Sequence, residues 1–164
     1  MKKALCMIAL AALVLPGCKK IEHSGEFTYT GCVTTKSADT KGLFDGQDSI
    51  LILEYTPSGL AVTHLNAAIN CAFEMTGLNC EAFLEGNVLH YWVTLPEGPV
   101  ANCTCVLGQL GSTVSGLEFG KEYTLDYRCE FTHLEPIKFT YGIGFLRRID
   151  VNRVARIQNI VVTE

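Results

Sequence analysis

The residues with the widest choice of chemistry in this chain are its cysteines and one histidine. Cysteines occur at positions 71, 80, 103 and 105, and His64 precedes the first of them by a few residues. Thiolates and imidazoles bind structural zinc, but such sites usually use cysteine pairs with about two to four residues between them. The Cys103-Thr104-Cys105 spacing is tighter than that. Disulfide bonds are therefore the first expectation, and a zinc site is the alternative.

The N-terminus favours disulfides because it indicates export. Met1-Lys2-Lys3 precedes an apolar run from Ala4 to Val14, which is shorter than the roughly 20 residues of a membrane-spanning helix. The run ends in Leu15-Pro16-Gly17-Cys18, which resembles the lipobox of bacterial lipoproteins. This resemblance implies a signal peptide over residues 1–17, cleavage before Cys18, and acyl chains on Cys18 that hold the protein to a membrane. Lysine rather than aspartate follows Cys18, which favours the outer membrane of the cell envelope.

Export also changes how many cysteines are left to pair. Cys6 leaves with the signal peptide and Cys18 carries lipid, so the remaining disulfide candidates are Cys32, Cys71, Cys80, Cys103, Cys105 and Cys129. An even number in an exported chain favours disulfides, although sequence alone does not select the connectivity. Cys103 and Cys105 project from the same face of a strand, so each is expected to pair elsewhere, with Cys71 and Cys80 nearest. That assignment leaves Cys32 for Cys129, a pair that needs a bulge or a different partner because Cys32 is out of phase with Phe27 and Tyr29.

No set of residues has the spacing of a catalytic centre. His64 is in phase with Leu60 and Val62, and a histidine on such a face is more often a buried side chain bonded to backbone than a base or ligand. The glycines of Gly142-Ile143-Gly144 lack the further glycine and the helix of a nucleotide-binding loop. We therefore expect no catalytic residues, no cofactor and no metal.

One predicted hairpin carries the main indication of function. Its strands run from Cys80 to Glu85 and from Val88 to Leu95 around a Gly86-Asn87 turn. In that register the outward face carries Phe83, His90 and Trp92 together with Glu81 and Glu85. Aromatic rings beside carboxylates can stack on sugars or anchor a protein partner. The alternative is that another strand, or the segment around Phe27, covers this face.

Most of the remaining chain has the pattern of strands and turns. Alternating or apolar runs predict strands over residues 27–34, 49–55, 60–64, 123–129 and 137–145, and a weaker one over 154–162. No helix of useful length is predicted after the signal peptide. We expect a lipidated tether over residues 18–25 and a single all-β domain over 26–164, an Ig-like antiparallel sandwich of seven to nine strands stapled by disulfides.

Two resemblances support this fold. The residues Leu117, Gly120 and Tyr123 have the spacing of the tyrosine corner of fibronectin-III and other Ig-like sandwiches, in which the tyrosine hydroxyl bonds to backbone slightly upstream. A wider resemblance is carried by the segments Thr63-His64-Leu65-Asn66, Asn70-Cys71, Cys103-Thr104-Cys105 and this corner. It is a resemblance to small Ig-like lipoproteins of the Bacteroidetes cell envelope. The chain departs from them in having Cys80 and in lacking an acidic residue soon after Cys105. The resemblance implies fold and location and brings no activity.

Charge excludes one class of partner. Removal of Lys2 and Lys3 leaves 11 basic residues (13 − 2) against 17 acidic ones, a mature charge of −6 with no basic run for nucleic acid. The sequence therefore predicts a membrane-anchored, non-catalytic binding or accessory module for a glycan or an envelope protein. The alternative is a structural or assembly lipoprotein of a surface complex or fimbria.

Overall fold

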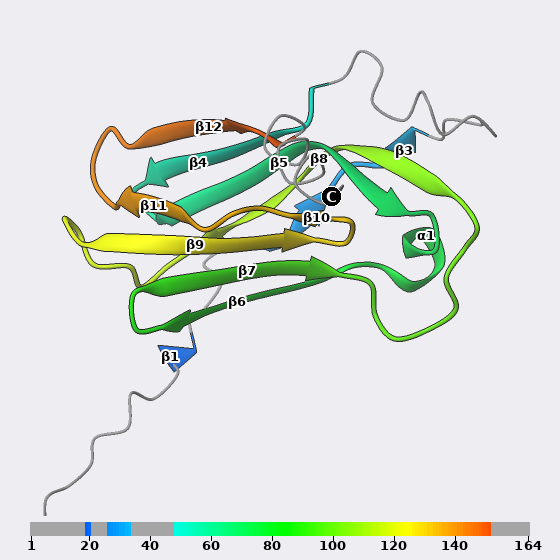
Figure 1. Cartoon of the computed structure of the whole chain (residues 1–164), viewed down its shortest axis with the longest axis horizontal. Helices are drawn as coiled ribbons and strands as arrows, with labels where there is room; N and C mark the ends of the chain where they lie inside the picture. The colour runs from blue at the N-terminus through cyan, green and yellow to red at the C-terminus, as the bar shows by residue number, and fades with distance from the viewer. Residues whose placement is uncertain (1–18, 21–25, 34–47, 152–164) are drawn as a thin grey trace, which may run out of the picture.

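The computed structural model shows a sandwich of two β-sheets, which confirms the all-β prediction (Figure 1). It describes residues 19–20, 26–33 and 48–151, and in 19–20 and 32–33 the backbone only. The described part contains one short helix, α1 (Phe73–Thr76), and no helix there is long and apolar enough to cross a membrane. The signal peptide, Cys18 and the predicted strand over 154–162 lie outside the described residues.

The first sheet holds the predicted hairpin. Its strands follow the order β1 (Lys19–Lys20), β6 (Asn79–Glu85), β7 (Val88–Thr94), β9 (Glu122–Cys129) and β10 (Thr132–His133), and β11 (Ile137–Thr140) also pairs with β9. All neighbours are antiparallel except β7 and β9, which run parallel. The parallel pair places residues that are far apart in sequence next to each other at the centre of the sheet.

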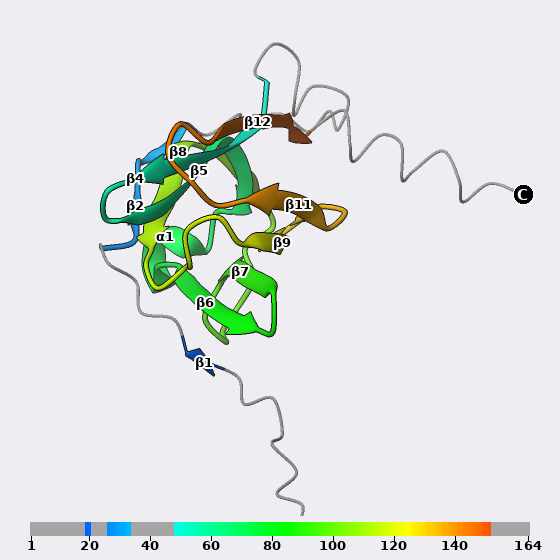
Figure 2. The same ribbon diagram turned by 90° about the vertical axis from the view of Figure 1, so that its left-hand side faces the viewer.

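The second sheet packs over the first, as the two views show (Figures 1 and 2). Its order is β12 (Leu146–Asp150), β4 (Ile50–Thr56), β5 (Gly59–Asn70), β8 (Thr104–Val114) and β2 (Thr28–Tyr29), and β3 (Cys32–Val33) also pairs with β8. The inward side chains of both sheets form one core, whose fully buried members include Leu53, Leu89, Leu107, Leu125 and Tyr127. Burial of these apolar side chains supplies the main stabilising free energy of the fold.

Strands β5 and β8 both change phase part-way along. The inward residues are Leu60, Val62 and His64 before the change, and Ala67 and Ile69 after it. Asn66 causes the change on β5 with a φ of 54°, and its side-chain amide donates to the carbonyl of Asp48 at 2.9 Å. On β8, Gly108 and Gln109 are both exposed at the matching place. A strict alternation therefore does not describe either strand along its whole length.

The hairpin and the tyrosine corner form as predicted. Leu84 pairs with Leu89, Ala82 with Tyr91, and the first residue of the turn, Gly86, has a φ of 60°. A glycine at that place permits the tight turn of a two-residue hairpin. In the corner, the hydroxyl of Tyr123 accepts a hydrogen bond from the backbone N–H of Glu118 at 2.8 Å.

The described chain has 12 strand segments, of which four have only two residues, and the eight longer strands (12 − 4) agree with the predicted seven to nine.

The predicted bounds of one strand were wrong. The strand expected over 137–145 ends at Thr140, and a separate strand, β12, follows at Leu146–Asp150. Gly142 and Gly144 lie between them, and Gly144 has a φ of 78°, so the chain turns there and crosses to the other sheet.

Candidate functional site

The cysteines form two classes. Cys71 and Cys103 are joined by a disulfide with 5.6 Å between their Cα atoms, which agrees with one of the expected pairings. Cys105 is buried and also disulfide-bonded, and its partner is none of the other cysteines whose side chains are described. Cys80 and Cys129 are free thiols. The expectation that these two are part of the disulfide set was therefore wrong.

Sheet register explains why Cys80 and Cys129 do not pair. Both stand opposite Val93 of β7, one from β6 and one from β9. Two strand spacings separate their Cα atoms by about 10 Å, which is beyond the reach of a disulfide. Cys32 belongs to the other sheet, where it stands opposite Leu107, so the expected pair of Cys32 with Cys129 does not form. Burial raises the pKa of Cys80 to about 11 and that of Cys129 to about 12.

The disulfides exclude the alternative zinc site. Cys71, Cys103 and Cys105 are all oxidised, so three of the four proposed thiolates have no free sulfur for a metal. Among the described residues, no group of three or more histidine, cysteine, aspartate or glutamate side chains is arranged to hold a metal ion.

His64 lies in the core, as its phase predicted, but its partners are side chains rather than backbone. Its Nε2 atom is 2.7 Å from the hydroxyl of Ser49, and its Nδ1 atom is 2.7 Å from the hydroxyl of Tyr127. All three residues are at most 2% exposed. Burial lowers the pKa of His64 to about 4, so the ring is neutral and both nitrogens serve hydrogen bonds. A substrate could reach this set only by opening the core.

The predicted aromatic residues come together on the outward face of the first sheet. The rings of Phe83 and His90 stack with centroids 4.5 Å apart, and the Trp92 ring lies 5.0 Å from Phe83 and 5.3 Å from His90. All three side chains are partly exposed. The segment around Phe27 pairs with β8 in the other sheet, so it does not cover this face. We call Phe83, His90 and Trp92 with Asp126 and Arg128 the aromatic face.

Asp126 organises the aromatic face. Its carboxylate accepts hydrogen bonds from Nδ1 of His90 at 2.8 Å, Nε1 of Trp92 at 3.0 Å and the guanidinium of Arg128 at 3.2 Å. Partial burial works to raise the pKa of Asp126, but these donors outweigh it and lower the pKa below its ordinary value. The carboxylate is thus ionised and fixes the rotamers of both rings. Arg128 also places its guanidinium 4.7 Å from the centre of the Trp92 ring.

Asp126 and Arg128 were not recognised from sequence as part of this surface. Both were visible as the polar positions of an alternating strand. Their placement depends on the parallel pairing that sets His90 opposite Asp126 and Trp92 opposite Arg128. Nothing local in the sequence indicates that pairing.

His90 has one ring nitrogen without a hydrogen bond. Its Nε2 atom is buried without a hydrogen-bond partner, 3.6 Å from a carboxylate oxygen of Glu85.

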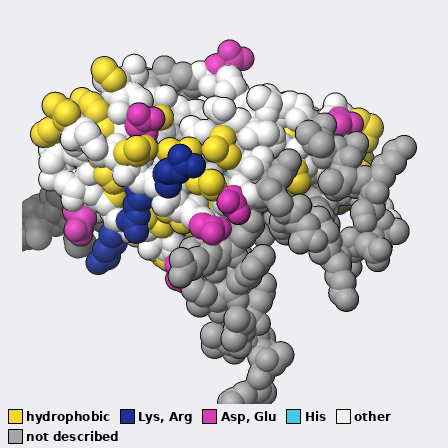
Figure 3. Space-filling model, turned by 90° about the horizontal axis from the view of Figure 1, so that it is seen from above, with side chains coloured by type: hydrophobic (Ala, Val, Ile, Leu, Met, Phe, Trp, Pro, Cys, Tyr) yellow, Lys and Arg dark blue, Asp and Glu magenta, His cyan; other side chains and the backbone are white. Residues whose placement is uncertain are grey.

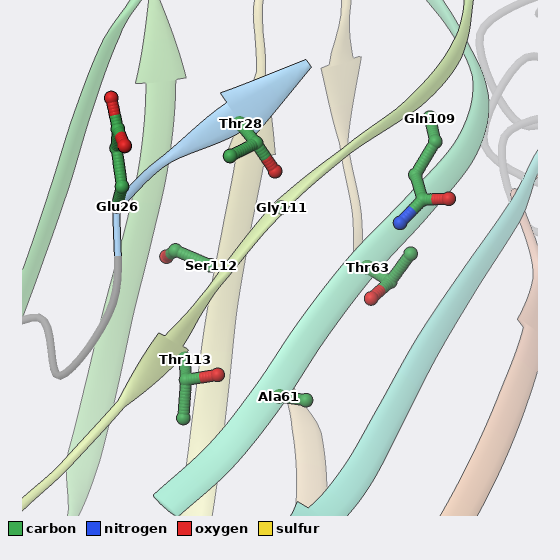
Figure 4. A pocket seen from close by; sticks show the side chains of 8 residues that line it. All are labelled: Glu26, Thr28, Ala61, Thr63, Gln109, Gly111, Ser112 and Thr113. Carbon is green, nitrogen blue, oxygen red and sulfur yellow. The ribbon is translucent and has the colours of Figure 1, made fainter. Parts of the chain in front are cut away.

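Among the residues that the structure describes, two concavities lie away from the aromatic face. A shallow one of about 190 Å³ crosses the outer face of the second sheet, where Thr63, Gln109 and Thr113 surround a floor of Ala61 and Gly111 (Figure 4). Glu26 is the only charged residue among those that line it. The other, of about 410 Å³, opens between β11 and β12. None of the residues predicted for a site lines either concavity.

Comparison with known protein families, characterised proteins and solved structures found no match to this chain. The aromatic face and the N-terminal sequence are therefore the two features that indicate a function.

Proposed function

We propose that the chain is an outer-membrane lipoprotein that binds a glycan or an envelope protein, without catalysis, through the aromatic face. The lipobox-like Leu15–Cys18 segment supports the anchor. The observation that carries the binding role is a cluster of three aromatic side chains on an outward sheet surface, in which one carboxylate holds His90 and Trp92 and Phe83 stacks on His90. Outward strand positions are ordinarily polar, and aromatic side chains are enriched where proteins bind partners.

The rigidity of the face favours binding. Trp92 is held by its N–H on Asp126 and by the Arg128 guanidinium over its ring. Side chains that are already fixed lose less conformational entropy when a ligand arrives. Glu81 and Glu85 are exposed beside the rings and can accept hydrogen bonds from sugar hydroxyls or from a partner's donors.

Trp92 allows a direct test because it is the single tryptophan of the chain. The lipidated full chain in phospholipid vesicles is mixed with a panel of glycans and envelope proteins while Trp92 emission is recorded. A saturable shift with one ligand supports the proposal, and it should be lost in Phe83→Ala. The matched control is Ile52→Ala on the other sheet, which should keep the shift. A Trp92 signal unchanged by the whole panel would count against the binding role.

The sandwich also offers a surface for the alternative, an assembly lipoprotein. Within the described residues, β11 pairs only with β9 and β12 only with β4, so both present an open edge on the same side of the molecule. The cavity between them is lined by Leu134, Ile137 and Ile149. Figure 3, seen from above, shows apolar, basic and acidic side chains together on the exterior. Open edges can accept a partner's strand, so this function predicts oligomers that Ile149→Lys disrupts.

A further inference from the structure

The N-terminal strand ties the anchor to the sheet that carries the aromatic face. Lys19 pairs with Leu84 and Lys20 with Phe83, so β1 extends the sheet beyond β6 (Figures 1 and 2). Cys18 directly precedes Lys19 in the chain, and neighbouring strands of a sheet are about 4.8 Å apart. Lys19 and Lys20, the described residues of the tether, are thus part of the sheet.

This attachment limits which ligands the face can meet. Antiparallel pairing puts Lys19, which follows Cys18 in the chain, near the end of β6 that leads into the Gly86-Asn87 turn. A lipid on Cys18 therefore holds this end of the hairpin, and Phe83 with it, at the bilayer surface. A short tether raises the effective concentration of ligands in the same membrane and excludes ligands that its length cannot reach. We infer that the ligand of the aromatic face is the saccharide headgroup of an anionic glycolipid in the anchoring leaflet.

The chemistry of the face fits such a headgroup, and this inference rests on the proposed function. Glu81, Trp92 and Arg128 stand opposite one another on three neighbouring strands. The indole is thus flanked by a carboxylate, which accepts from sugar hydroxyls, and by a guanidinium. Arg128 uses Nε and Nη2 on Asp126, and its side chain is 49% exposed. Its Nη1 can bind a phosphate or carboxylate of the headgroup.

The first measurement locates Trp92 relative to the bilayer. The lipidated full chain is placed in vesicles of phosphatidylethanolamine and phosphatidylglycerol, with a share of phospholipid that carries a nitroxide on its headgroup. We expect Trp92 emission to be quenched at least about twofold more than in a variant with about 12 Gly and Ser residues inserted between Cys18 and Lys19. Equal quenching in the two proteins would overturn the inference.

The second measurement identifies the ligand source, with rough-type lipopolysaccharide as the probe. Incorporated in the vesicles, it should shift Trp92 emission of the wild type and of Arg148→Ala, an exposed arginine on the other sheet, but not of Arg128→Ala. The oligosaccharide released from it should need a higher concentration. If the released oligosaccharide acts equally well on the wild type and the insertion variant, the membrane-borne ligand is overturned while the binding role stands. If Trp92 responds to nothing, both fail.

Discussion

His64 and Tyr127 form a hydrogen bond that connects the two sheets through the middle of the core, with 2.7 Å between Nδ1 and the hydroxyl oxygen. His64 comes from β5 of the second sheet and Tyr127 from β9 of the first. A second connection joins Tyr91 of β7 to Ser112 of β8 at 2.9 Å. Buried polar groups that satisfy each other in this way favour one relative placement of the sheets over sliding alternatives.

The buried histidine should make stability depend on pH. Burial lowers the folded-state pKa of His64 to about 4 from 6.5, so between these values the unfolded chain binds a proton that the folded chain does not. The free energy of unfolding is therefore retained above pH 6.5 and falls as the pH drops toward 4, by about 2 kcal/mol between pH 7 and pH 5. Urea unfolding at the two pH values measures it.

The control for that prediction is His64→Gln, which keeps hydrogen-bonding capacity but does not titrate. The difference in pH dependence between wild type and variant isolates the contribution of His64 to the free energy of unfolding. Asp126 does not interfere, since its lowered pKa affects stability only below the ordinary aspartate range. A variant with the same pH dependence as the wild type would contradict the assignment.

Replacing Asp126 with alanine should disorder the aromatic face. Trp92 and His90 lose their shared acceptor, and we expect a red shift of Trp92 emission and a loss of about 2 kcal/mol in the free energy of unfolding. Glu122→Ala, at an exposed position of the same strand, is the comparison and should change neither quantity. Unchanged emission in Asp126→Ala would mean that the carboxylate does not position the indole.

Tyr123→Phe should destabilise the fold by about 1 kcal/mol, because the buried ring stays while the bond from the Glu118 N–H is lost. Tyr141→Phe is matched to it, since the Tyr141 hydroxyl makes no hydrogen bond within the described residues. Denaturant midpoints of the two variants give the comparison. Equal midpoints would remove the energetic role of the tyrosine corner.

The disulfide between Cys71 and Cys103 spans a sequence separation of 32 residues. Loss of that crosslink in Cys71→Ala/Cys103→Ala should lower the free energy of unfolding, measured by denaturant titration, by about 3 to 4 kcal/mol, mainly because the unfolded chain gains conformational freedom.

Non-reducing peptide mapping of the wild type should show Cys105 joined to Cys32, because β3 pairs with β8 and sets Cys32 opposite Leu107. A Cys105 peptide linked to any other cysteine would contradict that pairing.

Local signals in the sequence were sufficient for the hairpin and the tyrosine corner. Each is encoded within a few consecutive residues: the turn glycine and alternating strands around residues 80–95, and the Leu117, Gly120 and Tyr123 spacing. Strand β12 was missed because Leu146–Asp150 has two arginines in succession and lies on an edge where nearly all its side chains are exposed, so no alternation of apolar and polar residues marks it. The strand pattern of β8 is weak in the sequence, because the strand carries Gly108 and Gly111 and glycine is more typical of turns.

The site was predictable only in part for a related reason. Phe83, His90 and Trp92 share a face through the hairpin register, which the sequence specifies. Asp126 joins them through a parallel pairing that brings it to His90, 36 residues away in the sequence, and no local pattern encodes that contact. The assignments of Cys80 and Cys129 to disulfides failed likewise, since they were made by proximity in sequence and by elimination rather than by sheet membership.

The free thiol of Cys129 makes opening of the folded protein measurable. Cys129 is buried on the inward side of the first sheet, and its raised pKa keeps it protonated at neutral pH. A thiol reagent can therefore modify it only in molecules whose sheets have separated, whereas the partly exposed Cys80 can react without that opening. The labelling rate of Cys129, followed without added denaturant, would measure how often the sandwich opens in the native state.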